Sequence, residues 1–156
     1  MLSDALSTVS WRARPRSFVA LMSLYESNYI RFGWLAGEPR ALGGRYCSAV
    51  WGDCDLILTV VERSPYTTSL NLTYLMSRDA GDPGACPDMG VRLYHDARLA
   101  EAQDPVPARG APLKRAPRAR AERELHQRWT RNVMLNKWLE YCVERGHRFS
   151  PAARIP

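Results

Sequence analysis

The feature that most constrains this sequence is an alternation of apolar and polar side chains in residues 68–77. One side of the extended chain would carry Leu70, Leu72, Tyr74 and Met76. The other side would carry Ser69, Asn71 and Thr73. A period of two residues is typical of a β-strand with one buried face and one solvated face. Because antiparallel sheets tolerate such an arrangement, we predict a two-layer α+β fold with helices on one face of the sheet.

Three further segments, residues 45–51, 55–62 and 89–96, have the composition of strands. The turn at Gly52 and Asp53, the turn around Pro65 and a stretch rich in Gly, Pro and Asp at 78–88 separate the segments. These connections predict an antiparallel meander of four strands. The fourth strand could run on as far as residue 102.

Two amphipathic helices are predicted on either side of the strands. In residues 17–36 apolar side chains recur every three or four positions, with Ser17 as the N-cap and Gly37 as the stop signal. The second helix spans 122–145 and ends before Gly146. Asn132 and Asn136 lie in the middle of its apolar face and require hydrogen-bond partners if they are buried. Three of the tryptophans are expected in the core: Trp51, Trp129 and Trp138.

The apolar faces of neighbouring strands must coincide, and this predicts the register of the sheet. For the second and third strands the expected pairs are Val60 with Leu70, Leu58 with Leu72 and Leu56 with Tyr74. For the third and fourth strands they are Tyr74 with Val91, Leu72 with Leu93 and Leu70 with His95. His95 then points toward the helices. The outward face becomes a polar lattice containing Asn71, Arg92 and Tyr94, with Asp96 beside Ser69.

The 156 residues suffice for one domain, which we place at 17–147 between a flexible N-terminal tail (1–16) and a C-terminal tail (148–156). The net charge of +6 comes from residues 1–16 and 104–121, because the remaining charges cancel. Residues 104–121 combine Pro, Ala and Arg with almost no bulky apolar side chain, which predicts a basic linker. The basic charge therefore does not indicate a basic groove on the folded body.

Several classes of protein are disfavoured by what the sequence lacks. It has no run of roughly 18 apolar residues and no signal peptide, so we expect a cytoplasmic protein without a membrane segment. Its four cysteines form no CxxC pair, and we expect them to be reduced. The phosphate-binding motifs GxGxxG and GxxxxGK[ST] are absent, as are the hydrolase motifs GxSxG and HExxH. No cofactor or metal site is predicted, and the oligomeric state stays open.

Four blocks of the sequence resemble a known bacterial family. They are LYESNYIR (24–31), VVERSPYTT (60–68), VRLYHDARLAE (91–101) and NKWLEYCVERGH (136–147). The chain is similar over residues 17–147 to the domain of unknown function family 1249. This resemblance implies an uncharacterised cytosolic protein of Gram-negative bacteria, in some genomes encoded near enzymes that cleave ADP-ribose and cyclic nucleotides. Residues 104–121 depart from the family pattern, which argues against a fifth strand near 97–121.

Two residues are candidates for acid-base chemistry. His95 could act as a general base because histidine titrates near neutrality. Adjacent residues of a strand face opposite sides, so Asp96 could not orient His95 unless a bulge intervenes. Glu62 is expected on the same face as His95 but more than about 10 Å away at two strand spacings. The alternative roles are a core histidine bonded to Asn132 or Asn136, and a solvated carboxylate at a strand end.

Other residues are candidates for binding. Asn71, Arg92, Tyr94, Asp96 and Arg63 could hold an anionic or planar ligand, or simply form a solvated sheet face. The linker could contact nucleic-acid phosphates through Arg109, Lys114, Arg115, Arg118 and Arg120. These basic residues lack interleaved aromatic side chains, so such binding would be weak.

The sequence therefore predicts a non-catalytic binding or adaptor module whose partner is a protein or a small anionic ligand. The first alternative is an enzyme or sensor acting on a nucleotide-like small molecule. The second is weak association with nucleic acid through the linker.

Overall fold

The structure is a computed structural model that describes residues 17–75, 88–104 and 121–156. The chain forms α2 (Phe18–Ala36), η1 (Pro39–Ala41), β1 (Arg45–Ser48), β2 (Asp55–Arg63) and β3 (Thr67–Leu75). After residues outside the described ranges come β4 (Asp88–Tyr94) and β5 (Leu99–Gln103). The C-terminal part contains α3 (Ala121–Glu144), η4 (Pro151–Ala153) and β6 (Arg154–Ile155). None of these helices is long and apolar enough to cross a membrane.

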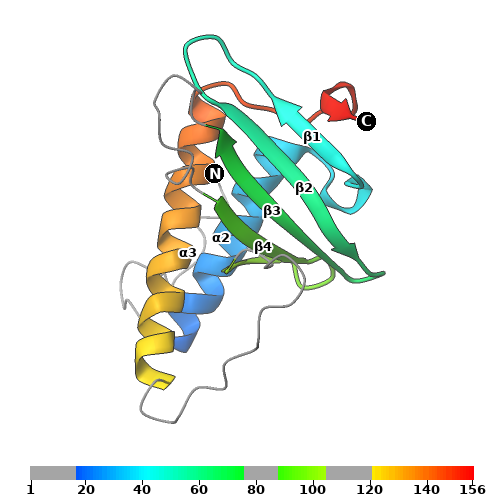
Figure 1. The fold of residues 1–156 in the computed structure, drawn as a ribbon. Helices are drawn as coiled ribbons and strands as arrows, with labels where there is room; N and C mark the ends of the chain where they lie inside the picture. The colour runs from blue at the N-terminus through cyan, green and yellow to red at the C-terminus, as the bar shows by residue number, and fades with distance from the viewer. Residues whose placement is uncertain (1–16, 76–87, 105–120) are drawn as a thin grey trace, which may run out of the picture.

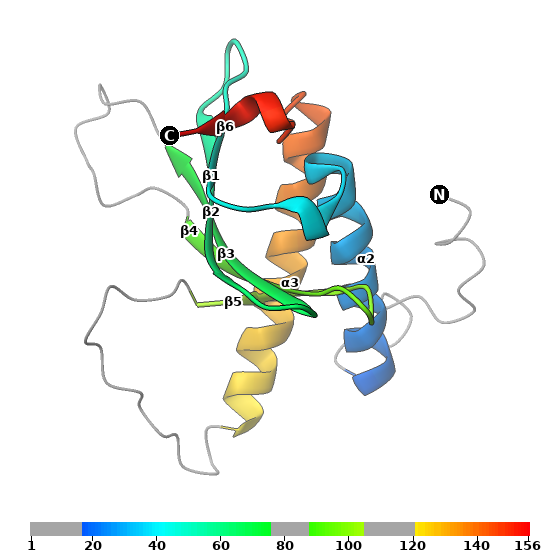
Figure 2. The ribbon, with the colours of Figure 1, turned by 90° about the vertical axis from the view of Figure 1, so that its right-hand side faces the viewer.

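The strands form one antiparallel sheet in the order β5-β4-β3-β2-β1-β6. Figures 1 and 2 show α2 and α3 packed side by side against one face of this sheet. The predicted α+β class and the two-layer arrangement are therefore confirmed. The count of four strands was too low, because β5 extends the meander at one edge and β6, which follows α3 in the chain, pairs with β1 at the other.

Helix α2 begins and ends where its sequence signals predict. The Ser17 hydroxyl accepts a hydrogen bond from the Ala20 amide at 3.1 Å, and Gly37 ends the helix with φ of 72°. Only glycine adopts such a positive φ without steric cost. The helix buries Leu24, Phe32 and Leu35, so its apolar stripe faces the core.

The register of β2 with β3 is the predicted one, with Leu56, Leu58 and Val60 opposite Tyr74, Leu72 and Leu70. A bulge between Val60 and Glu62 then shifts the pairing, and Glu62 lies opposite Ser69. Ser69 belongs to the outward face, so the prediction that Glu62 shares a face with His95 was wrong. An extra residue in one strand reverses the faces of all residues that follow it.

The predicted register of β3 with β4 was wrong by four residues. Leu70 pairs with Val91, Leu72 with Met89, and Thr68 with Leu93. A shift by an even number of residues leaves every side chain on its face, so the alternation alone cannot distinguish these registers. His95 therefore does not pair with Leu70.

Strand β4 ends at Tyr94, and residues 95–98 form a turn that leads back into β5. Arg98 in this turn has a φ of 55°, a left-handed conformation that is costly for a residue with a Cβ atom. The expectation that the fourth strand would run on to residue 102, and the doubt about a fifth strand, were wrong. The turn reverses the chain four residues after Tyr94 and allows β5 to pair with β4.

The outer edge of β5 is covered by asparagines of both helices. Asn28 of α2 donates to the Ala100 carbonyl at 3.3 Å, and Asn132 of α3 accepts from the Ala102 amide at 2.7 Å. Asn136 donates to the Asn28 side chain at 3.1 Å. All three asparagines are fully buried. The buried asparagines predicted in the second helix therefore satisfy backbone groups of an edge strand and do not contact His95.

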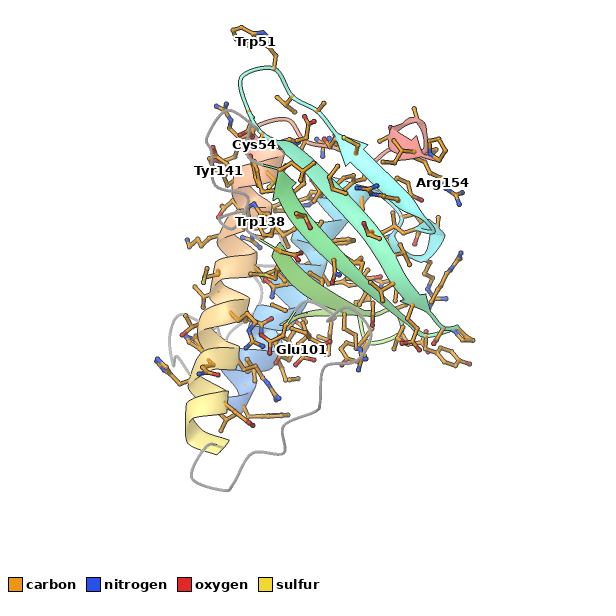
Figure 3. The ribbon with its side chains drawn as sticks, viewed as in Figure 1. Trp51, Cys54, Glu101, Trp138, Tyr141 and Arg154 are labelled. Atoms are coloured by element: carbon orange, nitrogen blue, oxygen red, sulfur yellow. The ribbon has the colours of Figure 1, made fainter. Side chains whose placement is uncertain are left out.

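Residues 148–156, predicted as a tail, contain η4 and β6. Phe149 is buried, and its amide donates to the Leu35 carbonyl at 2.8 Å. Trp129 and Trp138 pack against the core as predicted. Trp51 is 98% exposed, so its predicted burial was wrong. Figure 3 shows Trp51 projecting from the connection between β1 and β2, because β1 ends before it at Ser48.

Candidate functional site

His95 begins the turn between β4 and β5 and is 5% exposed. Its amide donates to the Tyr66 carbonyl at 2.9 Å, and its Nε2 lies 2.8 Å from the Thr68 Oγ1. Among the described residues nothing bonds to the His95 Nδ1, although this atom is buried. Burial, followed by the charges of Arg40 and Arg63, lowers the pKa of His95. His95 is therefore a neutral imidazole at pH 7 with one unpartnered nitrogen.

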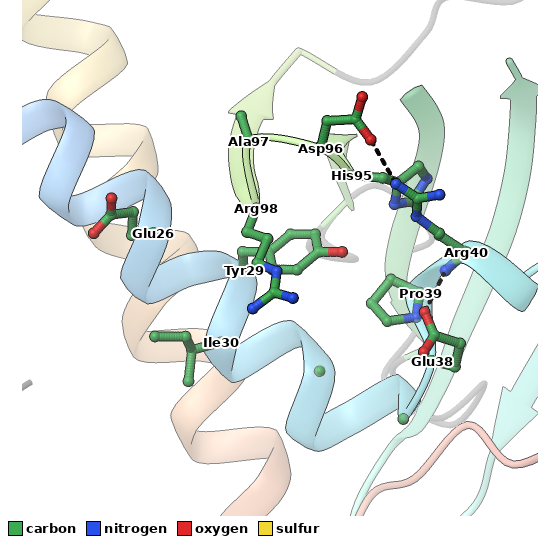
Figure 4. Close-up of a pocket in the computed structure, with 12 residues that line it drawn as sticks. Glu26, Tyr29, Ile30, Glu38, Pro39, Arg40, His95, Asp96, Ala97 and Arg98 are labelled. Atoms are coloured by element: carbon green, nitrogen blue, oxygen red, sulfur yellow. Dashed lines mark hydrogen bonds and ion pairs between the residues drawn. The ribbon is translucent and has the colours of Figure 1, made fainter. Parts of the chain in front are cut away.

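An open pocket of about 880 Å³ lies beside His95. Helix α2 forms one wall with Glu26, Tyr29 and Ile30, and the turn 95–98 forms the opposite wall. The connection from Gly37 to Arg40 closes one end (Figure 4). Pockets of several hundred Å³ accommodate small organic ligands.

Two arginines line this pocket. Arg40 lies in η1, where its amide contacts the Glu38 carboxylate at 3.4 Å and its carbonyl accepts from the Arg63 guanidinium at 2.8 Å. Its own guanidinium forms an ion pair with Asp96 at 2.6 Å. Arg98 forms no ion pair or side-chain hydrogen bond within the described ranges.

Tyr29 supplies the aromatic surface of the pocket. Its pKa is raised, first by burial and then by Glu38, while Arg40 and Arg98 oppose this effect. Both arginines line the same pocket as Tyr29. The pocket thus combines an aromatic ring, two arginines and a buried imidazole, with carboxylates at Glu26, Glu38 and Asp96.

The predicted site residues fall into separate groups. His95 and Asp96 both line the pocket, and Arg63 supports it from behind Arg40. The expectation that His95 and Asp96 face opposite sides of a strand was wrong, because both lie in the turn 95–98, where Asp96 pairs with Arg40. Glu62 is exposed on the outward side of the bulge and does not line the pocket.

The outward lattice is arranged differently from the prediction, because the register of β4 differs. Arg92 lies between Ser69 and Glu101 and donates to the Ser69 hydroxyl at 3.3 Å. Tyr94 donates to the Glu101 carboxylate at 3.1 Å. Asn71 lies opposite Thr59 and Gly90, so Asn71 and Tyr94 are not cross-strand neighbours. The Glu101 carboxylate lies on the edge strand β5, where it also contacts Tyr25 of α2 at 3.5 Å and Arg128 of α3 at 3.7 Å.

The predicted nucleic-acid contacts, Arg109, Lys114, Arg115, Arg118 and Arg120, lie outside the described residues. So does the predicted tail at 1–16.

A buried polar cluster was missed by the sequence reasoning. The Ser48 Oγ lies 2.9 Å from the His147 Nδ1, and the His147 Nε2 lies 3.0 Å from the Asp53 carboxylate. Tyr74 also donates to Asp53, and Arg145 lies 3.7 Å from it. Ser48 lies in β1, Asp53 in the connection from β1 to β2, and His147 in the segment after α3. About one hundred residues separate Ser48 from His147, so no local motif marks the cluster.

The cluster has the residue types of a hydrolytic triad but not its accessibility. His147 is 0% exposed and Ser48 is 6% exposed. The Ser48 hydroxyl also accepts the Arg148 amide at 3.1 Å. These bonds fasten the chain after α3 to β1, which is a structural function.

Together the fold and the pocket define a two-layer α+β protein in which two helices cover one face of a six-stranded antiparallel sheet. The family model described as "Protein of unknown function (DUF1249)" matches residues 31–148, and the chain belongs to this family. The chain is also 30% identical over 132 residues to the "Uncharacterized protein YqiB" of Escherichia coli K12, across 83% of this chain and 90% of that protein. The protein of the same name from Escherichia coli O157:H7 matches to the same extent. No solved structure shows significant similarity to the chain.

Proposed function

We propose that this protein is a non-catalytic binding module that holds a small anionic ligand in the pocket between α2 and the turn 95–98. The observation that carries the proposal is the buried His95, whose Nδ1 has no partner in the described structure and which lines the pocket. A buried nitrogen without a partner costs about 1–3 kcal/mol. In the tautomer that carries the proton on Nδ1, the Nε2 accepts from the Thr68 hydroxyl, and a ligand oxyanion that accepts from the Nδ1–H group would recover part of that free energy.

The arginines support an anionic ligand. After burial, the positive charges of Arg40 and Arg63 lower the pKa of His95, while Glu38 and Asp96 oppose them, so this end of the pocket holds guanidinium groups as well as carboxylates. Arg98 adds a guanidinium with no competing partner in the described residues, and guanidinium binds carboxylate or phosphate in a bidentate manner. Tyr29 would pack against the apolar or planar part of the ligand.

Binding is favoured over catalysis by the state of the polar groups around the pocket. The Nε2 of His95 is occupied by Thr68, whose side chain is 1% exposed. The Tyr29 hydroxyl has a raised pKa and is a poor base at neutral pH. The enzyme or sensor of a nucleotide-like molecule remains the alternative, with His95 as the base.

A cytoplasmic location is part of the proposal and is supported by the free thiols of Cys47, Cys54 and Cys142.

A ligand screen tests the proposal. Thermal shifts should be measured with small carboxylates, inorganic phosphate, sugar phosphates and nucleotides, since a bound ligand stabilises the fold by RT ln(1 + [L]/Kd). We expect at least one anion to raise the Tm of the wild type and to do so less in Arg98→Gln. The matched control is Arg92→Gln, which removes a guanidinium from the outward lattice. The proposed site is contradicted if the anion raises the Tm of Arg98→Gln as much as that of the wild type, or if only Arg92→Gln loses the rise in Tm.

The same screen addresses the alternatives. Chromatography of each nucleotide after incubation shows whether product forms, which would favour the enzyme. The linker hypothesis is tested by deleting residues 106–120 and titrating single-stranded RNA at several salt concentrations. A protein partner would be recovered from a native extract by a tagged full-length chain and not by ligand screening.

A further inference from the structure

We infer that the Asp96 carboxylate occupies the anion position of the pocket and that the ligand's oxyanion displaces it from Arg40. This inference rests on the proposed function and adds which residue competes with the ligand. In Figure 4 the Arg40–Asp96 ion pair connects η1 to the turn 95–98 at the end of the pocket where His95 lies. The Arg40 Nη2 and the Asp96 Oδ1 are 2.6 Å apart, the distance of a charge-assisted hydrogen bond.

The position taken by Asp96 is one that a ligand oxyanion can use. Carboxylate and phosphate oxygens bind guanidinium in the same geometry, so the Asp96 carboxylate shows where an oxyanion fits against Arg40. Both Arg40 and Asp96 line the pocket, together with His95, whose Nδ1 has no partner among the described residues. A ligand that replaced Asp96 would therefore contact Arg40 while its remaining atoms faced the pocket.

The ion pair is weak enough to be exchanged. The side chains of Arg40 and Asp96 are 53% and 63% exposed, and exposed ion pairs contribute little to stability because water screens them. Once displaced, the Asp96 carboxylate would return to water at little cost.

Arg40 is held in place independently of Asp96. Its amide contacts Glu38 and its carbonyl accepts from Arg63, so the main chain of Arg40 stays anchored when the ion pair opens. The Arg40 guanidinium can therefore exchange the Asp96 carboxylate for a ligand oxyanion while the main chain of η1 stays in place.

The ligand class that follows is a small carboxylate or phosphate whose body packs on Tyr29. In the free protein the Asp96 carboxylate competes with the ligand for Arg40, and this competition lowers the affinity of the pocket for any oxyanion. Removing the Asp96 charge should therefore strengthen binding instead of weakening it. If Asp96 instead made favourable contacts with the ligand, removing its charge would weaken binding.

The experiment is calorimetric titration of the full chain with two probes, inorganic phosphate and succinate, in the wild type and in Asp96→Asn. We expect Asp96→Asn to bind at least one probe about three- to tenfold more tightly. The matched control is Asp88→Asn, because Asp88 bonds to Thr73 and lies outside this pocket. The control should bind as the wild type does, and the probe preferred by Asp96→Asn identifies the oxyanion.

A third variant, Arg40→Gln, connects the gain to the ion pair. In the double variant with Asp96→Asn the gain in affinity should disappear. If the wild type binds a probe and Asp96→Asn binds it equally or less tightly, Asp96 is not a competitor, although the proposed function stands. If no variant binds either probe, Asp96→Asn included, the inference fails, and the wider ligand screen decides the proposed function separately.

Discussion

At the scale of single residues, hydrogen bonding and burial determine which polar side chains are available. His95 was predicted to be inward and is buried, yet its partner is Thr68 on the neighbouring strand and not an asparagine of α3. The partner could not be predicted, because it depends on a register that even-numbered shifts leave undetermined. The sequence therefore indicated the residue but not its surroundings.

The lowered pKa of His95 predicts a pH dependence of stability. The unfolded chain binds more protons than the folded one below the ordinary histidine pKa of about 6.5, so stability is present above that pH and decreases as the pH falls below it. Urea unfolding of the wild type and of His95→Gln should show a smaller decrease from pH 7.5 to 5.5 in the variant. His126→Gln, at an exposed position of α3, is the control. Equal slopes in the wild type and His95→Gln would show that His95 titrates normally.

The lowered pKa of Asp53 predicts a second decrease in stability, at lower pH. Burial opposes its ionisation, but hydrogen bonds from Tyr74, from the Cys54 amide and from His147 outweigh burial and lower the pKa of the carboxyl. A lowered pKa stabilises the fold above the unfolded value of about 3.9 and loses that contribution as the pH falls through the folded value. Tyr74→Phe should therefore flatten the decrease in stability below pH 4, measured by urea midpoints. If the stability of Tyr74→Phe decreases as steeply below pH 4 as that of the wild type, the Tyr74 hydrogen bond does not contribute to the acid transition.

At the scale of elements, the asparagines explain how an edge strand can lie under two helices. Apolar periodicity predicted both helices and two polar interruptions, Asn132 and Asn136, on the buried face. What the interruptions bind could not be predicted, because the residues of β5 were assigned to a continuation of the fourth strand as far as residue 102. Both buried positions of β5 (Leu99–Gln103) are alanines, which have a low preference for strands and give a weak apolar alternation.

Asn132→Leu tests this covering of the edge. The substitution leaves the buried Ala102 amide without its acceptor, which should cost about 1–3 kcal/mol in the free energy of unfolding. Hydrogen exchange should show the Ala102 amide losing protection more than amides of β2. Asn132→Asp keeps an acceptor and should protect the amide better than leucine does. Undiminished protection in Asn132→Leu would mean that another group covers the edge.

The segment after α3 gives a further prediction at this scale. His147→Ala removes both bonds of the ring, to Ser48 and to Asp53, and leaves a cavity in a fully buried position. We expect a loss of stability of about 2–4 kcal/mol, together with faster exchange of the Phe149 amide than of the α2 amides. His126→Ala provides the exposed comparison. If Phe149 keeps its protection, contacts other than His147 hold the segment to β1.

At the scale of the whole molecule, the alternating strand and the two amphipathic helices were sufficient to predict the architecture. Two apolar helices and one apolar sheet face can bury their surfaces only against each other. The edges were less predictable: β6 has two residues, and β5 follows a turn whose left-handed residue is an arginine rather than a glycine. The pocket depends on that turn, so its arginines were missed while His95 and Asp96 were recognised.

The central claim is that the buried imidazole of His95 and the arginines beside it form a binding site for a small oxyanion. The most direct test follows the imidazole nitrogens of His95 by ¹H–¹⁵N NMR while the tightest anion from the ligand screen is titrated in. Our account predicts a saturable shift of the His95 Nδ1 resonance, with the nitrogens of His126 unchanged. An anion that saturates the protein and leaves both His95 nitrogens unmoved would contradict the account.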